Sequence, residues 1–64
     1  MDDLAQKYIR RIRNTNKRIY AQRFWDYLNG YMPIEPSHGL SYMAAQAVRM
    51  ELHRIYRETE ATEA

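Results

Sequence analysis

The side chains that could act in catalysis or hold a metal are few and widely spaced in this chain. His38 and His53 lie 15 positions apart, which is too far for a local ligand pair, and no cysteine accompanies them. We interpret both as solvated or hydrogen-bonded histidines. Asp26 and Glu35 form no evident acid–base pair, and the two glycines of the chain form no phosphate-binding loop. This inventory predicts a protein that is not an enzyme and binds no cofactor or metal.

Basic side chains are concentrated in the N-terminal part of the chain instead. Between Leu4 and Trp25 there are seven cations and no acidic residue. The seven are Lys7, Arg10, Arg11, Arg13, Lys17, Arg18 and Arg23. Such a face either neutralises phosphates along a nucleic-acid backbone or only solvates the outer side of a helix. The net charge of +2 and four glutamates in the last 14 residues weaken the nucleic-acid interpretation.

Aromatic residues follow the basic segment, and Trp25 is the most informative of them. On a helical wheel it points about 140° away from Tyr20, off the apolar stripe. One interpretation is packing against a kink, a loop or a dimer mate. The other is an exposed anchor for a partner, since Trp, Tyr and Arg dominate binding hot spots. Arg23 and Tyr31 lie near the same end of the predicted helix and would complete such a patch.

Helical periodicity covers most of the sequence, and no strand pattern or internal repeat interrupts it. We expect a helix or helix pair at 2–29, a turn at 30–37, a last helix at 38–58 and a frayed tail at 59–64. The polar triplet at 14–16 marks either a bend in one long helix or the start of a second helix at Thr15. Because no glycine or proline stands there, we favour one kinked helix. Apolar faces are predicted from Leu4 to Ile19 and from Leu40 to Ile55.

These elements predict an all-α fold in a single small domain, residues 1–64. The proline-containing turn would join a long kinked first helix to the second as an antiparallel hairpin, with three helices or a dimeric bundle as alternatives. A hairpin of two helices has only one helix–helix interface and leaves the apolar side chains at its edges exposed to water, which favours a homodimer. No apolar run is long enough to span a bilayer, and the acidic start does not resemble a secretory signal. Together with the absence of cysteine, this predicts a cytoplasmic protein.

Three weaker patterns remain. Pro33 and Pro36 match the spacing of polyproline ligands, but so short a match is more often a loop. Met43, Ala47 and Met50 share one side of the last helix, for which ordinary packing is favoured over a partner-binding groove. A helix-turn-helix reader needs a tight connection, which becomes plausible only if a second helix begins at Thr15.

We therefore predict a non-enzymatic binding protein that docks on a larger protein and modulates or inhibits it through its basic, aromatic-ended helix. The predicted contact residues are Arg10, Arg13, Lys17, Arg23, Trp25 and Tyr31. The alternative is a nucleic-acid-binding protein whose basic helix lies on the phosphate backbone. A helix lying on an anionic membrane surface is a third, weaker hypothesis.

Overall fold

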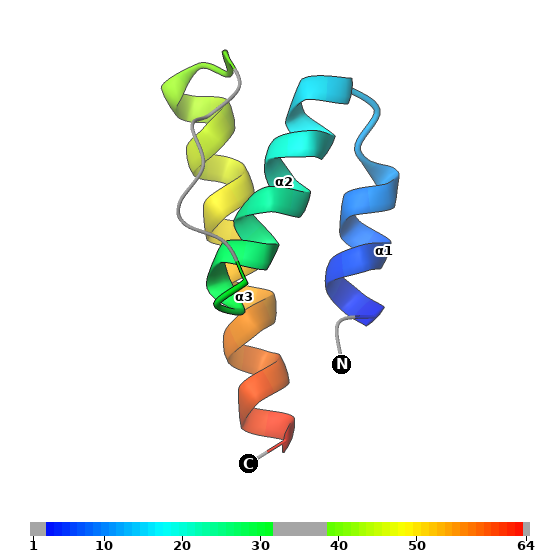
Figure 1. Ribbon diagram of the computed structural model, residues 1–64, viewed down its shortest axis with the longest axis vertical. Coiled ribbons are helices and arrows are strands. Elements are labelled where there is room, and N and C mark those ends of the chain that lie inside the picture. Colours follow the sequence, from blue (N-terminus) through cyan, green and yellow to red (C-terminus); the bar gives the residue numbers. More distant parts are fainter. Residues whose placement is uncertain (1–2, 32–38, 64) are drawn as a thin grey trace.

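The computed structural model of the chain describes residues 3–31 and 39–63, and every element in them is a helix (Figure 1). Helix α1 spans Asp3–Arg11, α2 spans Thr15–Leu28 and α3 spans Tyr42–Glu63. Each helix contacts the other two, so a single core lies between them. The predicted all-α fold is confirmed, with three helices rather than two.

The first helical segment is divided at residues 12–14, so the predicted single kinked helix is wrong. Asn14 has an extended backbone (φ −69°, ψ 123°), and its side-chain oxygen accepts a hydrogen bond from the Lys17 N–H at 2.9 Å. This is the geometry of a helix N-cap. The cap gives the chain a local reason to stop α1 and begin α2 at Thr15 without a glycine or proline.

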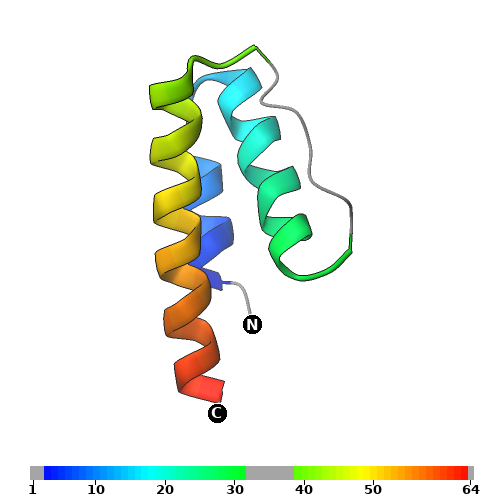
Figure 2. The ribbon, with the colours of Figure 1, turned by 90° about the vertical axis from the view of Figure 1, so that its left-hand side faces the viewer.

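Helices α1 and α2 run antiparallel, whereas α2 and α3 run in the same direction (Figures 1 and 2). Three contacts between α2 and α3 show the parallel register: Tyr20 with Arg49, Phe24 with His53 and Trp25 with Tyr56. The partners are separated by 29, 29 and 31 positions, and only parallel helices keep such an offset nearly constant. The predicted antiparallel hairpin across the proline segment is therefore wrong in direction.

The end of α2 is fixed by the asparagine–glycine pair that the sequence marks as a stop. Gly30 has φ +82°, which a residue without a Cβ adopts at little cost. Its N–H donates to the Tyr27 carbonyl and the Tyr31 N–H donates to the Asp26 carbonyl, both at 3.0 Å. This pair of bonds is a Schellman motif and satisfies two of the last carbonyls of α2. The two prolines of the predicted turn lie outside the described residues.

Helix α3 begins later and ends later than the sequence pattern predicts. The Ser41 hydroxyl accepts a hydrogen bond from the Ala44 N–H at 3.2 Å, so this serine caps the helix. The helix then continues to Glu63, through the segment predicted to fray. That segment lacks an apolar stripe, but its glutamates and alanines have high intrinsic helix propensity.

The core is formed by ten buried residues, to which all three helices contribute. They are Ala5, Ile9, Tyr20, Ala21, Phe24, Trp25, Ala45, Val48, Leu52 and Ile55. Tyr20 is 1% exposed, and its hydroxyl accepts a 2.5 Å hydrogen bond from the Arg49 Nε. That bond satisfies the one polar atom that Tyr20 carries into the core.

Three residues of the predicted apolar faces are exposed. Leu4 and Ile19 are 55% and 39% exposed, and Ala47 is also on the surface. The helical wheel that predicted a common face for Leu4 and Ile19 assumed one continuous helix. Because α2 is a separate helix that begins at Thr15, Ile19 does not lie on the same face as the apolar residues of α1.

Within residues 3–31 and 39–63, no helix combines the length and the apolar character that crossing a bilayer requires.

Replacing Asn14 tests whether α2 begins as a separate helix. The Asn14→Ala variant should lose about 1 kcal/mol of unfolding free energy, because the cap bond is lost, and Asn14→Asp should keep it. Asn16→Ala, two residues on and without a described capping bond, should leave stability unchanged or slightly raised. Urea denaturation measures all three variants. A gain in stability for Asn14→Ala would show that residues 12–14 are helical.

Tyr8 gives the packing of α1 on α3 a measurable pH dependence. Burial raises the pKa of the Tyr8 hydroxyl, and the Glu51 carboxylate of α3 raises it further. The folded state therefore favours the neutral phenol, so this stabilisation is complete below about pH 10 and is lost as the pH rises through the folded pKa. Tyr8→Phe should lose less unfolding free energy than the wild type between about pH 9 and about pH 11. Equal losses in the two proteins would contradict the raised pKa of Tyr8.

Candidate binding surface

Five basic residues gather where α1 ends and α2 begins, and we call this region the cationic end. It consists of Arg10, Arg11, Arg13, Lys17 and Arg18. All are exposed except Lys17, which is half-buried. No ion pair involves any of the five within the part of the chain that the structure describes. Their charges therefore face solvent and add to one another.

The helix directions strengthen the positive potential of the cationic end. Both α2 and α3 begin at this end of the molecule, so the positive ends of two helix dipoles point there (Figures 1 and 2). Only α1 ends there, and Arg10 and Arg11 stand in its last turn, where cations offset the negative dipole end. The Arg18 guanidinium also donates to the Ile12 carbonyl at 3.1 Å, just beyond α1.

Acidic residues occupy the opposite end. Glu58 and Glu60 lie near the end of α3, and both are exposed (Figure 1). Asp3, also exposed, lies in the first turn of α1, one nine-residue helix away from Arg11 and well short of the end of α3. The offset of about 29 positions between α2 and α3 sets Lys17 level with Gln46. At a rise of about 1.5 Å per residue, Glu58 lies about 18 Å further along the axis, roughly twice the Debye length of about 8 Å at physiological salt. The two ends therefore act as separate charged surfaces, although the net charge of the chain is only +2.

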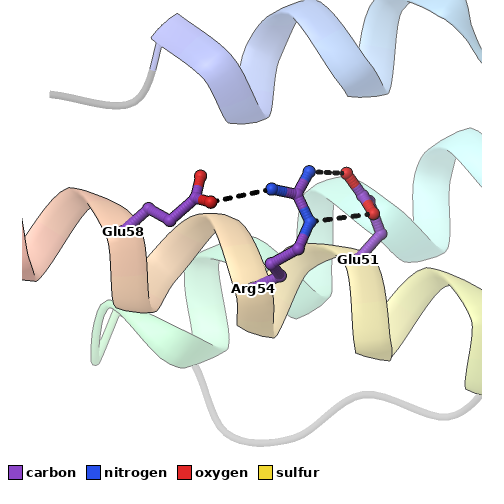
Figure 3. Close-up of polar contacts among 3 residues, drawn as sticks. All are labelled: Glu51, Arg54 and Glu58. Carbon is purple, nitrogen blue, oxygen red and sulfur yellow. Dashed lines mark hydrogen bonds and ion pairs between the residues drawn. The ribbon is translucent and has the colours of Figure 1, made fainter.

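Two glutamates of α3 bond to an arginine of the same helix (Figure 3). Arg54 forms a two-pronged pair with Glu51 through its Nε and one terminal nitrogen, and its other terminal nitrogen donates to Glu58 at 3.0 Å. Arg54 and Glu58 are each about half exposed, so these pairs contribute little to stability. They do engage two carboxylates that, from the sequence alone, could have paired with the cations of the first helix.

The six predicted contact residues do not form one patch. Arg10, Arg13 and Lys17 lie together at the cationic end. Arg23 is half-buried further along α2, and Tyr31, 81% exposed, follows the opposite end of that helix. A basic face and an aromatic end are thus separate regions of the surface.

Trp25 is in the core, so the prediction that it points off the apolar side is wrong. Its side chain is 3% exposed, and its ring meets the ring of Tyr56 edge-on at 6.0 Å between centroids. Because α2 contacts α1 as well as α3, its buried arc is wide enough to include both Tyr20 and Trp25. The apolar stripe predicted from the sequence assumes one neighbouring helix, and it is narrower than the buried side that α2 has in the structure.

Exposed apolar residues on α3 are the surface feature that sequence reasoning interpreted wrongly or missed. Met43 and Met50 are 76% and 63% exposed, and Ala47 is exposed between them. The interpretation of these three residues as ordinary core packing is therefore wrong. Tyr42 is 73% exposed at the start of α3 and is not among the predicted contact residues. Its position between Ser41 and Met43, at a helix start, is the signal in the sequence that indicates this exposure.

The described residues offer no arrangement suited to metal chemistry. No group of three or more histidine or acidic side chains comes together within 3–31 and 39–63. His53 is exposed, with its ring 5.4 Å from that of Phe24. His38 lies outside the described residues. The short connection between α1 and α2 meets the length of a helix-turn-helix, but the two helices run antiparallel instead of crossing as in that motif (Figure 1).

No protein-family model, curated protein or solved structure matches the chain.

The burial of Trp25 predicts a structural role that stability measurements can separate from binding. Trp25→Ala should lose about 3–5 kcal/mol, which equals the whole stability expected for so small a core. The variant should therefore be largely unfolded at room temperature. Tyr31→Ala should remain within about 0.5 kcal/mol of the wild type. Thermal melts followed by circular dichroism compare the two. A Trp25→Ala variant as stable as the wild type would place the indole outside the core.

Proposed function

We propose that this protein is a non-enzymatic binding module that docks through its cationic end on an acidic surface of a larger protein. By covering that surface it would modulate or inhibit its target. The contacts are made first by Arg10 and Arg13, which are exposed, with Lys17, Arg11 and Arg18 beside them. The observation that carries the proposal is the gathering of these five cations at one end, away from the carboxylates.

Exposed apolar side chains favour a protein as the target. Tyr42 and Met43 begin α3 at the same end of the molecule as the five cations (Figures 1 and 2). Arginine together with exposed aromatic and methionine side chains is typical of protein interfaces, where apolar anchors are surrounded by polar contacts. Binding to phosphates alone uses the charges and gives no role to Tyr42 and Met43.

Nucleic-acid binding is the second candidate, and one observation favours it. Asn14 and the first turn of α2 lie among the cations, and a helix N-terminus beside arginines suits a phosphate group. In this alternative, Arg10, Arg13 and Lys17 neutralise phosphates of one backbone, and affinity falls steeply as salt rises.

A pair of charge-matched variants tests the proposal. Arg10→Ala with Arg13→Ala removes two positive charges from the cationic end, while Lys7→Glu makes the same change in net charge at one exposed residue in the middle of α1. Tagged wild-type and variant proteins are used to capture partners from the native cell, with and without nuclease. We expect a protein partner that survives nuclease, is kept by the Lys7→Glu variant and is reduced at least about tenfold by the Arg10/Arg13 variant.

The same proteins are titrated into a short labelled duplex and a labelled single strand at about 50 mM and about 200 mM salt. Binding that weakens steeply between these two salt concentrations, together with nuclease-sensitive capture, would replace the protein target by nucleic acid. Equal capture by the Arg10/Arg13 variant and the Lys7→Glu variant would remove the cationic end from the binding surface altogether.

A further inference from the structure

The exposed side of α3, which faces away from α1 and α2, carries a seam with the spacing of a helix–helix interface. Met43, Ala47, Met50, Arg54 and Arg57 follow one another at steps of four and three residues. Alternating steps of four and three keep residues on one side of a helix and are the pattern of paired helices. All five are exposed, so no other described element covers this seam.

We propose that this seam is a self-association surface on which the α3 helices of two copies pack antiparallel about a two-fold axis near Met50. The inference does not rest on the proposed function, because it concerns a second copy of this chain and a side of α3 that shares only Met43 with the surface proposed above. In this arrangement Met50 meets Met50 of the second copy, and Met43 lies opposite Arg57 of the second copy. Ala47, the smallest side chain of the seam, allows the two helices to approach closely.

The charges of the seam select the antiparallel direction. A parallel pair would place Arg54 on Arg54 and Arg57 on Arg57, with like charges facing each other along half of the seam. The antiparallel pair instead lays the aliphatic stems of Arg54 and Arg57 over Ala47 and Met43 of the second copy. The arginine heads then remain at the edge of the interface, and Arg54 keeps its bonds to Glu51 and Glu58.

The charges of the whole molecule favour the same direction. Antiparallel pairing brings the acidic last turns of one α3, with Glu58 and Glu60, to the end at which the cationic end of the second copy lies (Figure 1). It also sets the two α3 dipoles side by side in opposite directions, whereas within one molecule α2 and α3 point the same way (Figure 2). A parallel pair would bring two cationic ends together.

The surface shape provides a place for the central side chain. An open depression on α3 is lined by Met50, His53 and Arg57. Since Met50 lies near the two-fold axis, the same residue of the second copy reaches this depression, and the contact is repeated on the other side. Methionine is unbranched and adapts to such shallow sites.

Sedimentation over a range of concentrations tests whether two copies associate. Met50→Glu should raise the dissociation constant of the dimer at least about tenfold, because it places two carboxylates at the axis. The matched control is Leu4→Glu, which makes the same charge change at an exposed apolar residue of α1 and should leave the dimer intact. Both sites are exposed, so circular dichroism should show both variants folded. A monomeric wild type at all concentrations, or equal weakening by the two variants, overturns the proposal.

Engineered cysteines test the direction, since the chain has none of its own. Under mild oxidation Met50→Cys should form a disulfide-linked dimer, whereas Met43→Cys and Arg57→Cys should each remain largely unlinked alone and link when mixed. A disulfide requires Cα atoms within about 7 Å, so linkage reports direct opposition. Efficient linkage of Met43→Cys to itself would show a parallel pair, and failure of Met50→Cys to link would remove the seam from the interface.

Discussion

Three short helices share one small core, and α2 makes this possible by burying a wide arc of its surface against both neighbours. Tyr20 and Phe24 lie on one side of that arc and Trp25 on the other. Tyr20 enters the core with its hydroxyl bonded to Arg49, and Trp25 meets Tyr56 edge-on. These contacts hold α2 and α3 parallel in one register. In a chain of 64 residues, few other apolar side chains are available to replace them.

The parallel register determines how charge is distributed. Because α2 and α3 begin at the same end, two positive dipole ends and the basic residues around the α1–α2 connection share one region. Glu58 and Glu60 of α3 are carried to the far end, and Arg54 bonds Glu51 and Glu58 within α3 itself. A nearly neutral chain thus presents a positive surface at one end and an acidic surface at the other.

The same packing leaves one side of α3 uncovered. Val48 and Leu52 are buried in the shared core, whereas Met43 and Met50, on the opposite side of the helix, stay in solvent. Among residues 3–31 and 39–63, no further element covers them. Methionines at interface spacing are well suited to a second helix because their side chains adapt to a partner surface.

Local signals in the sequence correctly determined the helical class, the stop at Gly30 and the concentration of cations between Lys7 and Arg23. Each of these depends on short-range chemistry: helical periodicity, a positive φ, or charge along the chain. The sequence left the break at Asn14 as one of two alternatives. A new capped helix and a continuous helix differ by only a small free energy, so the sequence pattern does not decide between them.

Only the tertiary structure decided which side chains are covered. Trp25 is buried because α2 packs against two helices, and Ala47 is exposed because one side of α3 has no neighbour among the described residues. A helical wheel shows the angles between side chains but not how many helices pack around them. The parallel direction of α3 was likewise invisible, since proline and glycine mark a turn without fixing how far the chain travels before the next helix. Burial and direction depend on contacts between residues some 30 positions apart, such as Tyr20 and Arg49, which are separated by 29.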